Sequence, residues 1–368
     1  MNHRIFSGAV CLLLSCNEPH LPDITQEGAH IIVSSDPGLL LCGGSLGQMD
    51  EFISLLSHEF STDPPVLSDR IDFNWLVSED FSSRTSCNEA FVACARRPHT
   101  VYSKYAPANH ELVHAVAFAI GHPPSFFAEG LATAYQGLGG GIQSFDLASF
   151  DQDVRPLLEM SGVDLSNTPG GYELAGGFTA FLITRFGIRA YLQVYAEMDR
   201  EAEADVIDGL FLENFGVGLE ASVSGFEAST IFSYGQAEFD AKLVECGAPG
   251  ILWDGVLVEQ HRSIACDQED VVGPSGGGTA VVFQTIDIDK DDLYELRVVG
   301  DPTDGTFSGV SMQCCGGCIS QINRLVSVED PARLIQLEAG RYSFRLHGSA
   351  LGETSVGFRL RRVEEIIP

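Results

Sequence analysis

The most constraining feature of the chain is a change in its pattern of apolar residues near residue 247. Before that point, apolar positions recur at helical spacing over residues 46–60 and again in several segments between residues 172 and 229. After it, short apolar or alternating runs separated by turn residues predict strands, among them Thr279–Ile286 and Tyr342–His347. Such strands are typical of a β-sandwich or jelly roll. We therefore expect an α+β chain in which a mixed first part precedes an all-β part.

The first part is expected to begin with a small sheet. Residues 30–34 and 99–104 have the composition of strands, and Ile71, Phe73 and Trp75 alternate with polar neighbours as in a half-buried strand. Helices are expected to follow these strands, so the mixed part should combine a sheet with a helical lobe.

The segment His110-Glu111-Leu112-Val113-His114 carries the clearest chemical signal. Positions four apart share one face of a helix, so His110 and His114 can present two imidazoles to one metal ion with Glu111 beside them. This helix is expected to begin near residue 107, where Asn109 can cap the free backbone N–H groups, and to end at residues 121–124. The next helix, expected over residues 125–136, carries Glu129.

These residues match the needs of a hydrolytic zinc site. Two histidines and a glutamate are a standard set of three protein ligands, and Glu129 is the leading candidate for the third. Glu111 is placed to take a proton from a zinc-bound water and to pass it to the leaving amine. The sequence therefore predicts one zinc ion (Zn2+) per chain and the hydrolysis of peptide bonds.

The same segments resemble the gluzincin metallopeptidases, whose third ligand is a glutamate on the helix after the H-E-x-x-H helix. Phe126–Ala132 is similar to that second helix, and Tyr172–Phe178 with residues 181–187 is similar to a later helix of many bacterial members. The resemblance spans residues 30 to 230. It implies a gluzincin-like domain with a small sheet, active-site helices and a helical lobe, and it does not reach the all-β part.

The ligand spacing departs from the best-known members and leaves a rival ligand open. Fourteen residues separate His114 from Glu129, fewer than in those enzymes. His122 is the rival, but a metzincin site would need Gly at 117 and His at 120, where this chain has Ala117 and Ile120. We therefore retain Glu129 and interpret His122 as a helix-end residue that the helix dipole stabilises.

Further site residues follow from the resemblance and from chemistry. Relatives stabilise the oxyanion with a Tyr or His from a later helix, and Tyr172 matches by its position in the motif. Tyr135 matches less well, and packing is the alternative role of both tyrosines. Asp164 and Glu173 are candidates for orienting the two histidines.

The N-terminus has the proportions of a secretory signal. Arg4 precedes an apolar run over residues 5–14 that is too short to span a bilayer. Leu13-Leu14-Ser15-Cys16 resembles the bacterial lipobox, which implies a lipid on Cys16; an ordinary cleaved signal is the alternative. We expect a signal peptide over residues 1–15, a tether over 16–29, and export to the bacterial cell envelope, either anchored by that lipid at the outer membrane or cell surface, or secreted.

Eight of the ten cysteines remain once Cys11 and Cys16 are set aside, an even number that fits disulfides in an oxidising compartment. Local spacing favours two pairings, Cys87–Cys94 and Cys246–Cys266. A metal cluster at residues 314–318 is disfavoured, because no second close cysteine pair or histidine pair accompanies these three cysteines.

The charge of the chain excludes some partners. Lys and Arg number 21 against 51 Asp and Glu, giving a formal net charge of -30, which argues against nucleic acid. We expect a zinc metallopeptidase domain over residues 30–245, acting on a peptide or protein substrate, and an accessory β-sandwich over residues 246–368. Two alternatives stay open: a surface-binding lipoprotein with a degenerate peptidase fold, and a zinc amidase that acts on cell-wall material.

Overall fold

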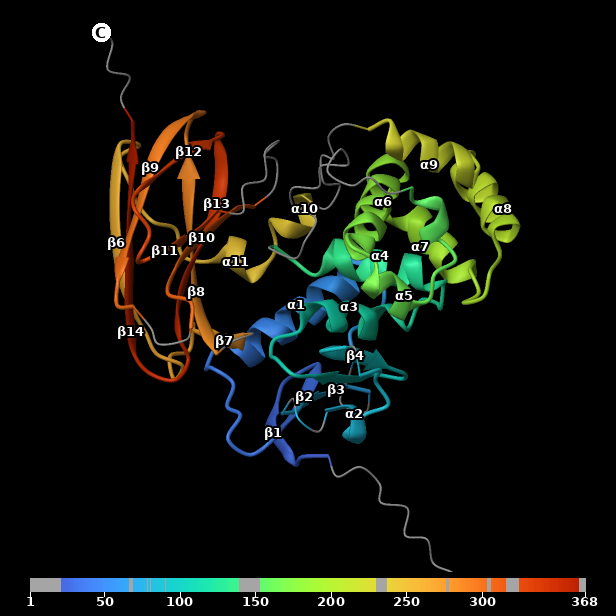
Figure 1. Ribbon diagram of the computed structural model, residues 1–368, viewed down its shortest axis with the longest axis horizontal. Coiled ribbons are helices and arrows are strands. Elements are labelled where there is room, and N and C mark those ends of the chain that lie inside the picture. Colours follow the sequence, from blue (N-terminus) through green and yellow to red (C-terminus); the bar gives the residue numbers. More distant parts are fainter. Residues whose placement is uncertain are drawn as a thin grey trace, which may run out of the picture.

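The computed structural model describes residues 21–65, 69–77, 79, 81–89, 91–138, 153–229, 237–275, 278–302, 306–315 and 324–363. Within these ranges the chain is α+β, with one sheet and a set of helices on one side and two facing sheets on the other (Figure 1). The expected signal peptide and Cys16 lie outside the described residues.

The first sheet has five strands in the order β1-β2-β3-β5-β4. Their bounds are β1 Ile24–Glu27, β2 Ile31–Ser35, β3 Ile71–Trp75, β4 Ala93–Arg96 and β5 Thr100–Ser103. The three central strands are parallel, while β1 and β4 run antiparallel at the two edges. Strands were thus correctly expected at residues 30–34, 71–75 and 99–104. The expected tether is wrong for residues 24–27, because β1 pairs with β2.

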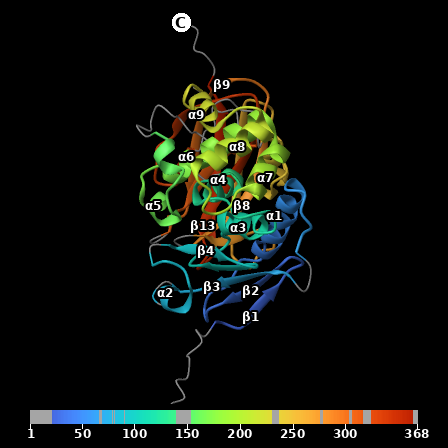
Figure 2. The ribbon, with the colours of Figure 1, turned by 90° about the vertical axis from the view of Figure 1, so that its right-hand side faces the viewer.

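Two helices, α1 and α2, lie between strands of this sheet in the chain, and the other helices follow it. Their bounds are α1 Ser45–Glu59, α2 Phe81–Arg84, α3 Asn109–Ala117, α4 Ser125–Tyr135, α5 Gly162–Asn167, α6 Gly171–Phe186, α7 Ile188–Glu197, α8 Ala204–Phe215, α9 Leu219–Glu227, α10 Ala237–Asp240 and α11 Val244–Gly247, with a 3-10 turn at Arg155–Leu157. In both ribbon views α3 and α4 lie between the sheet and helices α6–α9 (Figures 1 and 2). One apolar core joins most of these elements, while Phe81 of α2 packs in a separate small cluster with Leu76 and Cys87.

The predicted capping role of Asn109 is wrong. Ala108 occupies the N-cap position of α3 and Asn109 is the first helical residue, so its side chain cannot reach the free N–H groups of the first turn. Within the described residues, its buried Oδ1 has no hydrogen-bond partner.

The remaining strands form a β-sandwich. Their bounds are β6 Leu257–Ile264, β7 Val272–Ser275, β8 Thr279–Ile288, β9 Asp292–Gly300, β10 Gly309–Cys314, β11 Arg324–Ser327, β12 Arg333–Leu337, β13 Gly340–Ser349 and β14 Thr354–Arg362. The inner sheet, nearer the helices, has the order β11-β10-β13-β8-β7, and the outer sheet has the order β12-β9-β14-β6. Apart from β7, this distribution of strands is that of a jelly roll. Alternate residues of both sheets fill a second apolar core.

Two disulfides tie the sandwich to the helical part. Cys42, just before α1, bonds Cys266, and Cys246 on α11 bonds Cys315 after β10. The predicted pairing of Cys246 with Cys266 is therefore wrong, because the fold places residue 266 beside the start of α1 and residue 246 beside the inner sheet. The Cys87–Cys94 pairing is confirmed.

Candidate metal centre

Two consecutive helices bring the three expected ligands together. His110 and His114 lie one turn apart on α3, and Glu129 lies on α4. The Nε2 atoms of His110 and His114 are 3.0 Å and 3.2 Å from Oε2 of Glu129. One ligand atom from each residue lies within 4.8 Å of the others, so this group could hold a metal ion.

Gly130 explains how α4 comes to this position. A Cβ at Gly130 would lie 2.7 Å from the carbonyl oxygen of Ala175 on α6, and it would also collide with Oγ1 of Thr179. Only a residue without a side chain permits this close approach of two helices. The glycine therefore holds the backbone of the neighbouring ligand, Glu129, against α6.

The rival ligand and the two acids expected to orient the histidines are not among the three residues of the metal group. His122 follows α3 with its ring against Phe118, at a centroid distance of 5.8 Å, and is not part of the metal group. Asp164 accepts a hydrogen bond of 2.7 Å from Ser161 at the start of α5. Among the described residues, no hydrogen bond joins Asp164 or Glu173 to either site histidine.

Gln136 contacts the ligand that those acids were expected to orient. Its Oε1 lies 3.3 Å from Nδ1 of His110, the ring nitrogen that faces away from Glu129. A hydrogen-bond partner on the second ring nitrogen is the usual way in which a ligand histidine is oriented. Sequence reasoning missed Gln136, although it lies seven residues after Glu129 and so on the same face of that helix.

Glu111 is buried beside the ligands, with 8% of the residue exposed. The backbone N–H of Ala95, on the edge strand β4, donates a hydrogen bond to its carboxylate. Burial raises the pKa of Glu111 and the charge of Glu129 adds to the rise, while the two histidines oppose it. A carboxyl group whose pKa is moved toward neutrality suits the transfer of a proton.

The charges of the ligands favour an ion pair within the group. Burial lowers the pKa of His114, but the Glu129 carboxylate, 3.2 Å away, raises it overall. Burial also acts to raise the pKa of Glu129, but the two histidines outweigh it and hold this pKa well below its ordinary value. Metal ligands must be deprotonated, so a cation would replace the histidine proton beside the same carboxylate.

Of the two tyrosines considered from the sequence, Tyr172 lies at the metal group. Its ring on α6 stacks on that of His110, with centroids 5.7 Å apart and an interplanar angle of 4°. Burial raises the pKa of Tyr172, and the charges of the nearby glutamates add to this effect. Tyr135 instead packs edge-on against two core phenylalanines.

Tyr105 is a neighbour of the site that the sequence did not reveal. It follows β5, and burial together with the charge of Glu111 raises its pKa to about 12. Like an ordinary tyrosine, it is protonated at neutral pH and can donate a hydrogen bond. No motif or helical spacing connects Tyr105 to the histidines, so only the fold brings it close to Glu111.

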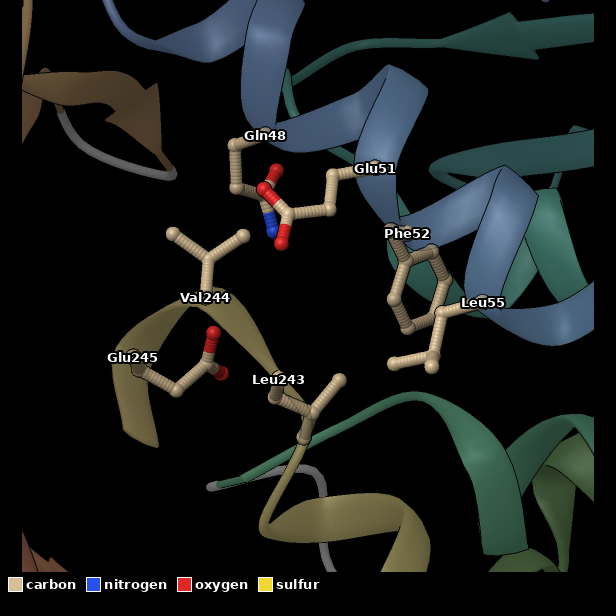
Figure 3. A pocket seen from close by; sticks show the side chains of 7 residues that line it. All are labelled: Gln48, Glu51, Phe52, Leu55, Leu243, Val244 and Glu245. Atoms are coloured by element: carbon tan, nitrogen blue, oxygen red, sulfur yellow. The ribbon is translucent and has the colours of Figure 1, made fainter. Parts of the chain in front are cut away.

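A small pocket lies between α1 and α11 (Figure 3). The residues that line it are Gln48, Glu51, Phe52, Leu55, Leu243, Val244 and Glu245. None of the three ligands lines this pocket. It lies where α1 packs against α11, the segment that precedes the sandwich.

Comparisons with known proteins do not identify the chain. No protein-family model and no curated protein matches it. One similar structure is PliG of Aeromonas hydrophila, a periplasmic inhibitor of g-type lysozyme, with a TM-score of 0.21 and 7% identity over 32% of this chain and 96% of that one. Another is rabbit GITRL, with a TM-score of 0.12 and 17% identity over 25% of this chain and 74% of that one. Both TM-scores are too low to indicate a shared fold.

The disulfides indicate the compartment. Three pairs join described cysteines, and Cys314 is disulfide-bonded as well. Such bonds persist in oxidising surroundings, which suggests an extracellular or periplasmic protein. Among the helices that the structure describes, none has both the length and the apolar character that a membrane span requires.

Proposed function

We propose that the protein is a zinc-dependent hydrolase of peptide bonds, a metallopeptidase of gluzincin type. The observation that carries this proposal is the convergence of His110, His114 and Glu129 within 4.8 Å, with Glu111 buried next to them. Two imidazoles and one carboxylate are a ligand set that catalytic zinc uses. When bound, zinc supplies Lewis acidity toward a carbonyl oxygen and makes water more acidic.

Glu111 is the proposed general base. It lies one residue from His110, and its carboxylate is shielded from solvent on α3. The carboxylate accepts a proton from the attacking water and returns it to the nitrogen of the leaving amine. Its raised pKa lies closer to neutral pH than that of an ordinary glutamate, and an efficient general base has a pKa close to the working pH.

Tyr172 is the proposed donor to the oxygen that becomes negatively charged when the carbonyl is attacked. Its ring lies on that of His110, and its raised pKa keeps the phenol protonated. A preorganised O–H donor in a buried site stabilises such a charge more strongly than water does. The ring also limits the positions that the His110 imidazole can take.

The edge strand β4 is the proposed docking position for an extended peptide. It is the last strand of the first sheet, and Ala95 on it contacts Glu111. The β4–β5 register and the bond from Lys104 N–H to the Val92 carbonyl leave the backbone groups of Ala93 and the carbonyl of Ala95 on the outer edge, where the Ala95 N–H already donates to Glu111. Main-chain pairing at such an edge binds peptides without regard to most side chains.

The proposal extends to location. We propose that the chain is exported and anchored in the bacterial cell envelope through a lipid on Cys16. The disulfide content supports export, and the lipobox-like residues 13–16 support the lipid. Replacing Cys16 with Ser should release the protein from the membrane fraction. Retention of the variant in that fraction would contradict a lipid anchor.

A peptide library incubated with the purified protein tests the activity. We expect cleavage that a chelator abolishes and that zinc restores, and no cleavage by the Glu111→Gln variant. Cleavage that persists unchanged with a chelator would refute the metallopeptidase. Release of amide-linked fragments from purified cell-wall material, with the peptide library intact, would favour the zinc amidase instead.

A further inference from the structure

We propose that the β-sandwich completes the metal centre, with Arg345 of β13 acting as a positioning residue for His110. The inference rests on the proposed function and goes beyond it, because it makes the sandwich part of the catalytic unit instead of an accessory. Three consecutive contacts connect the arginine to the imidazole.

The first contact is at the histidine. Gln136 Oε1 lies 3.3 Å from Nδ1 of His110 and can fix the ring so that Nε2 faces Glu129. Gln136 follows the last residue of α4, in the C-cap position. No further helical turn holds its backbone, so the residues that come next decide where its side chain lies.

The second contact is with those next residues. Gly137 has a φ of +93°, which turns the chain away from α4, and Leu138 is buried. The guanidinium of Arg345 donates a short hydrogen bond to the carbonyl oxygen of Leu138. This bond joins residues 207 positions apart in the sequence and reaches from the inner sheet to the end of α4. Arg345 therefore holds the segment that begins with Gln136.

The third contact fixes the arginine itself. Its Nη2 lies 3.2 Å from Oε1 of Glu245 on α11, and only 6% of that glutamate side chain is exposed. The neighbouring residue, Cys246, is bonded to Cys315 at the end of β10, so α11 cannot move independently of the inner sheet. The same Glu245 oxygen lies 3.7 Å from where a Cβ of Gly137 would be. Figure 3 shows Glu245 on α11, across the pocket from the residues of α1.

The charge arrangement favours this role over simple packing. Arg345 is a largely buried cation, with 16% of its side chain exposed, and desolvation lowers its pKa. A buried charge needs well-placed partners to offset the cost of removing it from water. Its hydrogen-bond partners here are one carboxylate and one carbonyl, and the carbonyl belongs to the loop of the metal centre; the guanidinium also lies over the Phe283 ring of β8, 5.8 Å from its centroid. Elsewhere on β13, Arg341 is half-exposed and binds Thr285 of the same sheet.

The test uses the full chain and compares zinc affinity across variants. Arg345→Met combined with Glu245→Gln removes both charges together, which avoids leaving one buried charge unpaired. We expect its zinc affinity to fall about tenfold, and that of Gln136→Ala to fall by about ten- to a hundredfold, as for other residues that orient metal ligands. The variant with all three changes should bind zinc no more weakly than Gln136→Ala, because the arginine acts through the glutamine. Arg341→Met, on the same strand and face, is the matched control and should bind like the wild type.

Two further readouts separate positioning from stability and from the proposed function. The visible absorption of the cobalt-substituted protein should change in the Arg345→Met/Glu245→Gln variant, which a loss of stability alone would not cause. Unchanged zinc affinity and an unchanged cobalt spectrum would overturn the inference, as would effects that simply add. If the wild type bound no zinc, the proposed function would fail, but the positioning role could still be tested. The 15N chemical shift of His110 Nδ1 in the metal-free protein should differ between the wild type and the Arg345→Met/Glu245→Gln variant. An unchanged shift would overturn the positioning role.

Discussion

The residues that meet in the metal centre are close in the sequence, whereas those that meet in the β-sandwich are far apart. All three ligands fall within residues 110–129, on two consecutive helices. In the sandwich, β6 pairs with β14, so that Ile264 faces Thr354, and the disulfide at its junction joins residues 224 positions apart. Residue spacing therefore specifies the first region directly, whereas the second depends on the order in which strands pair. The hydrogen bond from Arg345 to Leu138 connects the β-sandwich to the segment that follows the metal-binding helices.

The largest expected effect is a loss of activity without a loss of bound zinc, in the Glu111→Gln variant. Glu111→Gln keeps the shape of the side chain but removes the proton acceptor, so activity should fall by about 10²- to 10⁴-fold while zinc stays bound. Peptide cleavage and metal content of the same sample check both statements. Glu259→Gln, at an exposed position of β6, is the control and should leave activity unchanged. Full activity of Glu111→Gln would remove the proposed base from the mechanism.

Removing disulfides one at a time compares the effect of a long-range crosslink on stability with that of a local one. Cys42–Cys266 closes a separation of 224 residues and Cys87–Cys94 one of 7. Chain entropy predicts that replacing the first pair with serines lowers the free energy of unfolding by about 5 kcal/mol, and replacing the second by about 2.5 kcal/mol. Denaturant titrations of the two double variants test this order. An equal loss for both pairs would show that the junction disulfide restrains the unfolded chain no more than the local one does.

The sequence predicted the contacts between residues close in the chain better than the contacts between distant residues. Helical spacing correctly predicted that α3 and α4 exist, although α3 ends at Ala117 and not at residues 121–124, and the i, i+4 rule paired His110 with His114. Gln136 was within reach, because it repeats the face of Glu129 after two helical turns. The Asn109 cap failed by one position, which is the usual error of a predicted helix start.

The junction could not be predicted, for a physical reason. Cys246 and Cys266 are near in sequence, yet β6 of the outer sheet lies between them and separates them in space, so each has a distant partner. Arg345 occupies one of many alternating strand positions, and its sequence neighbours do not show that it faces Leu138. Only the pairing order of the strands determines which residues of the inner sheet face the helices.

Helix packing at the metal centre should be sensitive to a single methyl group. Gly130→Ala places a Cβ 2.7 Å from the carbonyl oxygen of Ala175, so α4 must shift from α6, at a cost of about 1–3 kcal/mol in the free energy of unfolding and with weaker zinc binding. Gly209→Ala on α8 meets no atom within 4 Å and should instead stabilise the chain by up to about 1 kcal/mol. Thermal unfolding and zinc titration of both variants distinguish these outcomes. Wild-type behaviour of Gly130→Ala would contradict the close packing.

The smallest expected effect is a dependence of zinc affinity on pH. Glu129 raises the pKa of His114 above its ordinary value of 6.5, and the ligand must be neutral to bind. As the pH falls below that raised pKa, zinc affinity should decrease by up to about tenfold per pH unit, since one proton competes with the metal. His347 of the sandwich, whose pKa burial and Arg345 lower to about 3, stays neutral at these pH values, so His347→Gln should give the same profile. A flat profile between pH 6 and 8 would contradict the histidine–glutamate pair.

The most direct test of a metal centre at His110, His114 and Glu129 is the metal content of the purified protein. Elemental analysis of the wild type after dialysis against metal-free buffer should give one zinc per chain, and that of His114→Ala should give none. Zinc retained by His114→Ala would place the metal elsewhere. A wild-type chain without metal that also fails to bind added zinc would contradict the account.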